Sequence, residues 1–138
     1  MARFPKIERK ISLTFFTELY RNGSVVYHHP YKLFYILRPT PYGGTSGYKI
    51  VISVPKRNIK QAVDRNRIKR QIRESFRLNY SNFKELLVSV ERQIDLLCIY
   101  LPNEHTASTI LSKKMASLLE RLSVLVSQDG NPPSSRSD

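Results

Sequence analysis

The sequence predicts a single α+β domain, an α/β sandwich whose elements follow in the order α-β-β-β-α-β-α. The chain has 138 residues, which suits one hydrophobic core, and its 41% hydrophobic residues are enough to fill that core. Apolar residues recur at helical spacing in three segments, 12–23, 59–79 and 106–127. Extended segments separate the first two of these helices, and an apolar run at 93–102 separates the last two.

The first predicted helix begins at Ser12, its expected N-cap, and stops at Gly23. Its apolar face carries Leu13, Phe16 and Tyr20. We expect Leu13 to pack in the core and the two aromatic side chains to stay partly accessible.

Two extended runs follow between residues 24 and 38, with a break or sheet edge near Pro30. Side chains alternate between the two faces of a strand. The second run therefore has one face made of Tyr31, Leu33, Tyr35 and Leu37. Its other face mixes aromatic and basic groups, namely Lys32, Phe34, Ile36 and Arg38. We expect this second face to be exposed to water, and it is the better candidate for contact with a nucleic acid.

A turn-rich loop at 39–47 leads to a third predicted strand at 48–55, which ends at Pro55. Residues 81–91 are expected to extend the helical structure of the preceding helix after a break. A strand–helix–strand passage such as the one from 48 to 101 normally forms a right-handed crossover.

The run at 93–102 is apolar on both faces, which predicts a central strand covered on both sides. Cys98 lies inside it and is expected to be a core residue. The final helix has an apolar stripe made of Leu111, Met115, Leu118, Leu122 and Leu125. Residues 128–138 have the composition of a disordered tail, so we expect the domain to span 1–127.

The charge of the chain favours a polyanionic partner. The formal net charge is +12 and the pI is near 10.1. Nucleic acid is the leading partner, and an anionic membrane is a weaker second. No apolar run reaches the roughly 20 residues that cross a bilayer. The N-terminal segment lacks the apolar stretch of a signal peptide. We therefore expect a cytoplasmic protein with no membrane partner.

Cysteine and histidine give little support for a metal site. The single cysteine excludes an internal disulfide framework and a cysteine-based zinc site. His28 and His29 are adjacent, so in a strand their side chains point to opposite faces. We expect no metal site in the protein.

The second predicted helix holds much of the charge. Between Lys56 and Arg77 the sequence has nine lysine or arginine residues and only two acids. On a helical wheel, Ile68, Ile72 and Phe76 form one apolar stripe, and an arginine-rich ridge faces away from it. Like charges four residues apart repel by about 0.2–0.5 kcal/mol per pair. A polyanion bound across the ridge would remove that repulsion.

The stretch AVDRNRIKRQIRESFR, residues 62–77, resembles the arginine-asparagine-arginine signature helix of the bacterial ribonuclease P protein subunit. The matching positions are Ala62, Val63, Arg65, Asn66, Arg67, Lys69, Arg70, Arg73, Glu74, Phe76 and Arg77. The upstream VISVPKR and the spacing of Phe16, Tyr20 and Gly23 are also similar to that family. The resemblance covers about residues 10–125.

This resemblance implies a fold like domain 2 of ribosomal protein S5, with a left-handed β-α-β crossover in place of the right-handed default. It implies the non-catalytic protein subunit of an endoribonuclease, in which a catalytic RNA with bound Mg²⁺ cuts precursor tRNA to form the mature 5′ end. The partners would be the catalytic RNA and precursor tRNA, with no obligatory protein partner. The Mg²⁺ would be bound mainly by the RNA. The acids of the sequence are scattered and indicate no catalytic or metal site in the protein itself.

The resemblance also implies two RNA-binding surfaces. The first, here called the basic surface, would contact the catalytic RNA and comprises Lys56, Arg57, Lys60, Arg65, Asn66, Arg67, Lys69, Arg70 and Arg73. The second, here called the aromatic set, would hold the single-stranded 5′ leader and comprises Phe16, Tyr20, Lys32 and Phe34. Stacking on aromatic rings contributes about 1–3 kcal/mol per base and tolerates sequence variation.

Two features depart from the family pattern. The loop KRNIKQAV lacks the glycine that is often found there, and Phe34 offers no hydroxyl to the leader. The sequence also leaves three other functions open. A ribosomal or general RNA-binding protein would have no role in tRNA processing. A protein-only nuclease is disfavoured by the scattered acids. A helix-turn-helix DNA reader is disfavoured by the strand pattern that follows the basic helix.

Overall fold

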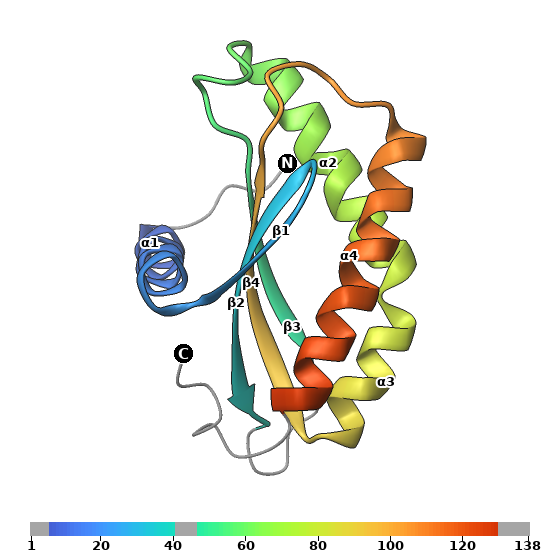
Figure 1. Ribbon diagram of the computed structural model, residues 1–138. Helices are drawn as coiled ribbons and strands as arrows, with labels where there is room; N and C mark the ends of the chain where they lie inside the picture. Colours follow the sequence, from blue (N-terminus) through green and yellow to red (C-terminus); the bar gives the residue numbers. More distant parts are fainter. Residues whose placement is uncertain (1–5, 41–46, 130–138) are drawn as a thin grey trace.

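The computed structural model describes residues 6–40 and 47–129, with side chains described for 14–40 and 47–128. The elements follow in the order α1 (Lys6–Asn22), β1 (Ser24–His28), β2 (Tyr31–Pro39), β3 (Tyr48–Ser53), α2 (Ala62–Asn79), α3 (Ser81–Ser89), β4 (Arg92–Tyr100) and α4 (Ser108–Asp129). Helix α1 covers one face of the sheet, and α2, α3 and α4 cover the other (Figure 1). The predicted α+β sandwich is confirmed, with α3 as a helix of its own.

The strands form one sheet in the order β1-β2-β4-β3. Strand β4 pairs antiparallel with β2 and parallel with β3. Its residues 94–98 are buried, Cys98 among them, which confirms the predicted central strand covered on both sides. The parallel neighbours β3 and β4 are joined through α2 and α3. This strand–helix–strand connection is the crossover that the sequence predicts. The left-handed sense that the resemblance implies for it stays a prediction.

Helix boundaries differ from the predicted ones. Helix α1 begins at Lys6, so Ser12 lies inside the helix and is not its N-cap. Ile7 and Ile11 are spaced four residues apart with Phe15 and Leu19, so a second apolar stripe, different from that of Phe16 and Tyr20, reaches toward the N-terminus and accounts for the earlier start. The predicted packing of Leu13 concerns a side chain outside the described ones.

Gly23 ends α1 as predicted. Its backbone N–H donates a hydrogen bond of 2.9 Å to the carbonyl oxygen of Leu19. A Cβ at this position would lie 2.6 Å from that oxygen, so only glycine fits without a backbone shift.

Helix α2 begins at Ala62 and not at 59, because the preceding residues form a separate turn. The N–H groups of Asn58 and Ile59 both donate to the carbonyl oxygen of Pro55. At the other end of the chain, α4 runs to Asp129, past the predicted domain boundary at 127. The tail beyond it, residues 130–138, lies outside the described part.

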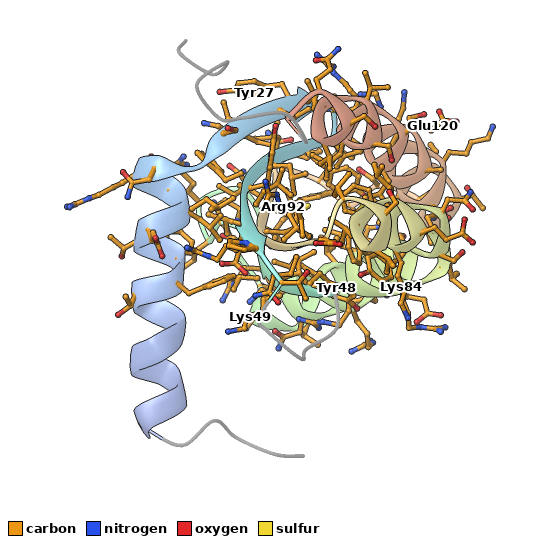
Figure 2. The ribbon with its side chains drawn as sticks, turned by 90° about the horizontal axis from the view of Figure 1, so that it is seen from below. Tyr27, Tyr48, Lys49, Lys84, Arg92 and Glu120 are labelled. Atoms are coloured by element: carbon orange, nitrogen blue, oxygen red, sulfur yellow. The ribbon has the colours of Figure 1, made fainter. Side chains whose placement is uncertain are left out.

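Two clusters of buried side chains hold these layers together. The larger lies between the sheet and α2, α3 and α4, and includes the predicted stripe of α4 except Leu125, which is only partly buried against it. The smaller lies under α1 and consists of Leu19, Phe34 and Leu97, with partly buried apolar side chains around them. In Figure 2, α1 lies alone on one side of the sheet, whereas the other three helices pack together on the opposite side. The two predicted RNA-binding surfaces therefore lie on differently built layers.

Candidate nucleic-acid interface

Helix α2 is anchored by the predicted apolar stripe. Ile68 and Ile72 are 0% exposed and Phe76 is 2% exposed. Ser75 is also buried, which the wheel did not predict, and its hydroxyl donates 2.9 Å to the carbonyl oxygen of Gln71. A serine can be buried in a helix because it bonds back to the preceding turn. The helix can thus hold its outward face rigidly.

The basic surface is largely open to solvent. Its exposed members are Lys56, Arg57, Lys60, Asn66, Arg67, Arg70 and Arg73, and its half-buried members are Arg65 and Lys69. None of its cations forms an ion pair with a residue of the described part. Nearby, Glu74 forms an ion pair with Arg77 at 2.6 Å, so this carboxylate does not neutralise a cation of the basic surface. Arginine-rich surfaces of this kind suit bidentate contacts with phosphate oxygens.

Arg65 differs from the other cations because its guanidinium holds the loop before α2. Its Nη1 donates to the carbonyl oxygens of Ile59, at 3.0 Å, and Lys60, at 2.8 Å. The same loop is fixed by buried Ile59 and by Asn58, whose side-chain amide donates 3.1 Å to the carbonyl oxygen of Leu101. This loop, residues 54–61, therefore has a defined path without a glycine. Arg65 thus stabilises this loop by hydrogen bonds while remaining partly exposed to solvent.

The aromatic set comes together at the junction of α1 and the sheet. The ring centroids of Phe16 and Tyr20 are 6.1 Å apart, and those of Tyr20 and Phe34 are 5.3 Å apart. The ammonium of Lys32 lies 5.2 Å from the centroid of the Phe34 ring. Tyr20 is 57% exposed, whereas Phe16 and Lys32 are half-buried. These four side chains therefore lie together at this junction, and their contact with the leader stays a prediction.

The expectation that the second face of β2 is exposed to water is wrong, because Phe34 is buried and Lys32, Ile36 and Arg38 are only half-buried. Phe34 is only 7% exposed because it belongs to the cluster under α1 with Leu19 and Leu97. Tyr20 also packs against it. In this conformation Phe34 supports the aromatic surface from below, and Tyr20 offers the exposed ring.

Arg38 docks α1 onto the sheet. Its Nε donates 2.6 Å to a carboxylate oxygen of Asp95 on β4, and its other end pairs at 2.9 Å with Glu18 on α1. Both hydrogen bonds raise the pKa of the guanidinium, and the bond to Asp95 has the larger effect. The signal in the sequence was Asp95 itself, because an acid in the middle of an apolar strand needs a cationic partner.

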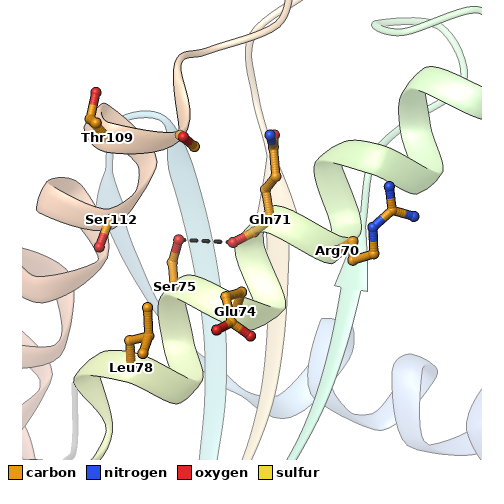
Figure 3. A pocket seen from close by; sticks show the side chains of 8 residues that line it. Arg70, Gln71, Glu74, Ser75, Leu78, Thr109 and Ser112 are labelled. Atoms are coloured by element: carbon orange, nitrogen blue, oxygen red, sulfur yellow. Dashed lines mark hydrogen bonds between the residues drawn. The ribbon is translucent and has the colours of Figure 1, made fainter.

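A groove of about 520 Å³ lies between α2 and α4, beside the line where these two helices pack together (Figure 3). It is lined by Arg70, Gln71, Glu74, Ser75, Leu78, Ser108, Thr109 and Ser112. At one end, the imidazole Nε2 of His105 lies 2.8 Å from the side-chain oxygen of Gln71. Arg70 is thus shared between the groove and the basic surface. No local pattern in the sequence predicts this groove, because it is formed by two helices far apart in the chain.

The described side chains offer no assembled metal centre. Among them, no group of three or more His, Cys, Asp and Glu residues is placed to hold an ion. Within the described helices, none is long and apolar enough to cross a membrane. What the described surface does offer is exposed cations on α2 and the exposed ring of Tyr20 on α1.

Comparison with known proteins identifies the family. The sequence pattern of the family described as Ribonuclease P matches residues 4–123. The ribonuclease P protein component of Finegoldia magna is 31% identical over 101 residues, which cover 73% of this chain and 75% of that protein. A shorter match to the ribonuclease P protein component of Ectopseudomonas mendocina is 59% identical over 34 residues, a quarter of each chain.

A solved structure supports the fold independently. The Staphylococcus aureus RNase P protein superposes with a TM-score of 0.58 at 22% sequence identity, over 79% of this chain and 89% of that one. The match to the family pattern over most of the chain and the relative that aligns along three quarters of its length agree with the signature on α2. The chain belongs to the ribonuclease P protein family.

Proposed function

We propose that this protein is the subunit of ribonuclease P that binds both the catalytic RNA and the precursor tRNA. The basic surface contacts the catalytic RNA, and the aromatic set holds the single-stranded 5′ leader. The protein thereby assists the endonucleolytic removal of the leader, which forms the mature tRNA 5′ end. The observation that carries the proposal is the exposed, unpaired cationic face of α2 in a chain of this family.

The two surfaces suit different parts of one ribonucleoprotein. Exposed cations neutralise phosphates whatever the sequence, which suits docking on a folded RNA. Exposed rings accept any base by stacking, which suits leaders that differ from one precursor to the next. Because mature tRNA lacks the leader, a leader-binding surface favours substrate over product.

The chemistry belongs to the RNA in this proposal. Mg²⁺, bound mainly by the RNA, would stabilise charge on the oxygens of the scissile phosphate. The described residues of the protein form no cluster of acids for such an ion. We expect the protein to act in the cytoplasm, without an obligatory protein partner.

Reconstitution tests this function directly. The protein, its cognate catalytic RNA and a precursor tRNA are combined over a Mg²⁺ titration, and cleavage at the mature 5′ end is measured. We expect the protein to increase cleavage most at low Mg²⁺, because its cations replace part of the ionic screening that the RNAs need. No increase at any Mg²⁺ concentration would contradict the proposal.

The alternatives make different predictions in the same assay. A general RNA-binding or ribosomal protein would bind ribosomal RNA and leave cleavage unchanged. A protein-only nuclease would cut the precursor without the catalytic RNA. Full activity from the two purified components would show that no further protein is needed.

A further inference from the structure

Tyr27 is an exposed aromatic residue that the family signature does not include. It lies on β1, at one edge of the sheet, and its side chain is 58% exposed (Figure 2). It stands directly across from Lys32 in the pairing of β1 with β2. The ammonium of Lys32 lies over the Tyr27 ring, 5.1 Å from its centroid, in a cation–π contact.

Lys32 connects Tyr27 to the aromatic set. Its ammonium lies at nearly equal distances from two rings, 5.1 Å from Tyr27 and 5.2 Å from Phe34. Phe34 in turn is covered by Tyr20, and Tyr20 neighbours Phe16. The chain of side-chain contacts therefore continues from α1, across β2, to the outer strand β1. Its two most exposed rings, Tyr20 and Tyr27, flank the buried Phe34 and the cation.

The opposite edge of the sheet shows what an edge tyrosine does when it serves packing. Tyr48 on β3 is 38% exposed, and its ring contacts Phe76 at 4.8 Å and Tyr80 at 4.6 Å between centroids. These edge-to-face contacts join the β3 edge to α2. Among the described residues no ring lies in such contact with Tyr27. Tyr27 is also more exposed than Tyr48, at 58% against 38%.

An open ring beside a cation is suited to single-stranded nucleic acid. A base stacks on the ring and the neighbouring phosphate approaches the ammonium, as in sequence-tolerant single-strand binding. The net charge of +12 attracts such a strand to the protein. Duplex RNA is a poor fit, because its bases are already stacked on one another.

We propose that Tyr27 is an additional stacking position for the 5′ leader, with Lys32 contacting the phosphate beside it. This inference rests on the proposed function and lengthens the leader segment that the protein holds. Phe16 and Tyr27 lie at the two ends of the surface, so they contact different nucleotides of the leader. Because stacking is tolerant, the additional contact depends on leader length and not on base identity.

The test uses the complex of the protein with its catalytic RNA. Precursor tRNAs are made uncleavable at the scissile phosphate, their leaders are lengthened by one nucleotide at a time, and the Kd of each is measured. Tyr27→Ala should match the wild type on mature tRNA and on the shortest leaders. It should lose about fivefold or more in affinity once the leader reaches the ring. Phe16→Ala should show its loss from a different leader length.

Matched variants separate stacking from packing. Tyr27→Phe retains a ring and should bind like the wild type, whereas Tyr27→Leu keeps apolar volume and should behave like Tyr27→Ala. Val124→Ala, at a similarly exposed position (57%) on α4, shortens an apolar side chain on the other layer and should change nothing.

The outcomes distinguish this inference from the proposed function. In one outcome, the affinity of the wild-type complex rises with leader length and the Tyr27→Ala complex has the same affinity at every length. This result would show that Tyr27 is not a stacking position and would leave the proposed function intact. A loss equal on mature and precursor tRNA would also overturn the inference. A wild-type complex that binds precursor and mature tRNA alike would remove the leader site itself, and this inference with it.

Discussion

The two candidate RNA surfaces of this protein are built in opposite ways. The basic surface comes from one helix and the loop before it, and that helix is anchored by three nearly inaccessible side chains, Ile68, Ile72 and Phe76. The aromatic set is collected from α1 and β2, over a small cluster centred on Leu19. One surface depends on a local pattern within a helix, and the other depends on how a helix docks on a sheet.

This difference implies different kinds of sensitivity. Binding through the basic surface should weaken with salt, because each neutralised phosphate releases counterions. Binding through the aromatic set, which contains a single cation, should depend less on salt and strongly on the position of α1. The docking of α1 relies on the Arg38 ion pairs, because few buried apolar residues hold it. A substitution that weakens RNA binding by one of these surfaces should therefore leave binding by the other unchanged.

The largest expected effect is the loss of the α2 anchor. Ile72→Ala removes a side chain that is 0% exposed and should lower the free energy of unfolding by about 2–5 kcal/mol. Urea denaturation measures this change. Val63→Ala, at a 73% exposed position on the same helix, is the control and should change stability by less than about 0.5 kcal/mol. Similar losses for both variants would mean that the stripe does not anchor the helix.

Phe16→Ala should weaken the leader surface next most strongly. We expect the complex with the catalytic RNA to lose about 1–3 kcal/mol of precursor affinity, with mature tRNA binding unchanged. Equilibrium binding of both RNAs measures the difference. Phe16→Leu keeps an apolar side chain packed against the cluster of Leu19, Phe34 and Leu97, so its loss of affinity reports the stacking of the ring alone. Equal losses for precursor and mature tRNA would exclude Phe16 from leader binding.

Arg38→Met tests whether α1 docking supports the aromatic set. It leaves Asp95, only 5% exposed, without its cation, and should cost about 1–2 kcal/mol of stability. This is less than for a fully buried pair, because the Arg38 side chain is 36% exposed. Hydrogen exchange should become faster in α1 and stay unchanged in α2, and precursor affinity should fall.

The comparison for this variant is the exposed pair of Arg77 and Glu74 on α2. Arg77→Met breaks an ion pair that has no buried member and should leave α1 exchange and precursor affinity as they are. If Arg38→Met also left both unchanged, the ion pairs would have no part in positioning the aromatic set.

The smallest expected effect is that of a single phosphate contact. Arg70→Ala should reduce the slope of log affinity against log salt by about 0.9 in binding to the catalytic RNA. Arg65→Ala should do so too and should also speed hydrogen exchange in the loop at 54–61, because Arg65 bonds the carbonyl oxygens of that loop. A salt slope that stays unchanged for Arg70→Ala would place this residue outside the RNA contact.

Residues inside one element were predictable because helical and strand periodicities act locally. The wheel identified the three anchor residues of α2, and the alternation along β2 identified the buried face of Tyr31, Leu33 and Tyr35. The expected exposure of the other face was wrong, because Phe34 is buried and Lys32, Ile36 and Arg38 are half-buried. Periodicity says which side chains share a face, but it does not say what covers that face. Here the cover is α1, which approaches from elsewhere in the chain.

The sequence by itself determined the class of the fold, the anchored basic helix and the family, because these rest on spacing within continuous segments. Only the tertiary structure decided which members of each face are free. It buried Phe34 under Tyr20, joined Arg38 to Asp95 and Glu18, and left Tyr27 open while Tyr48 was packed. The physical reason is that exposure and pairing depend on neighbours contributed by distant segments, which no local pattern specifies.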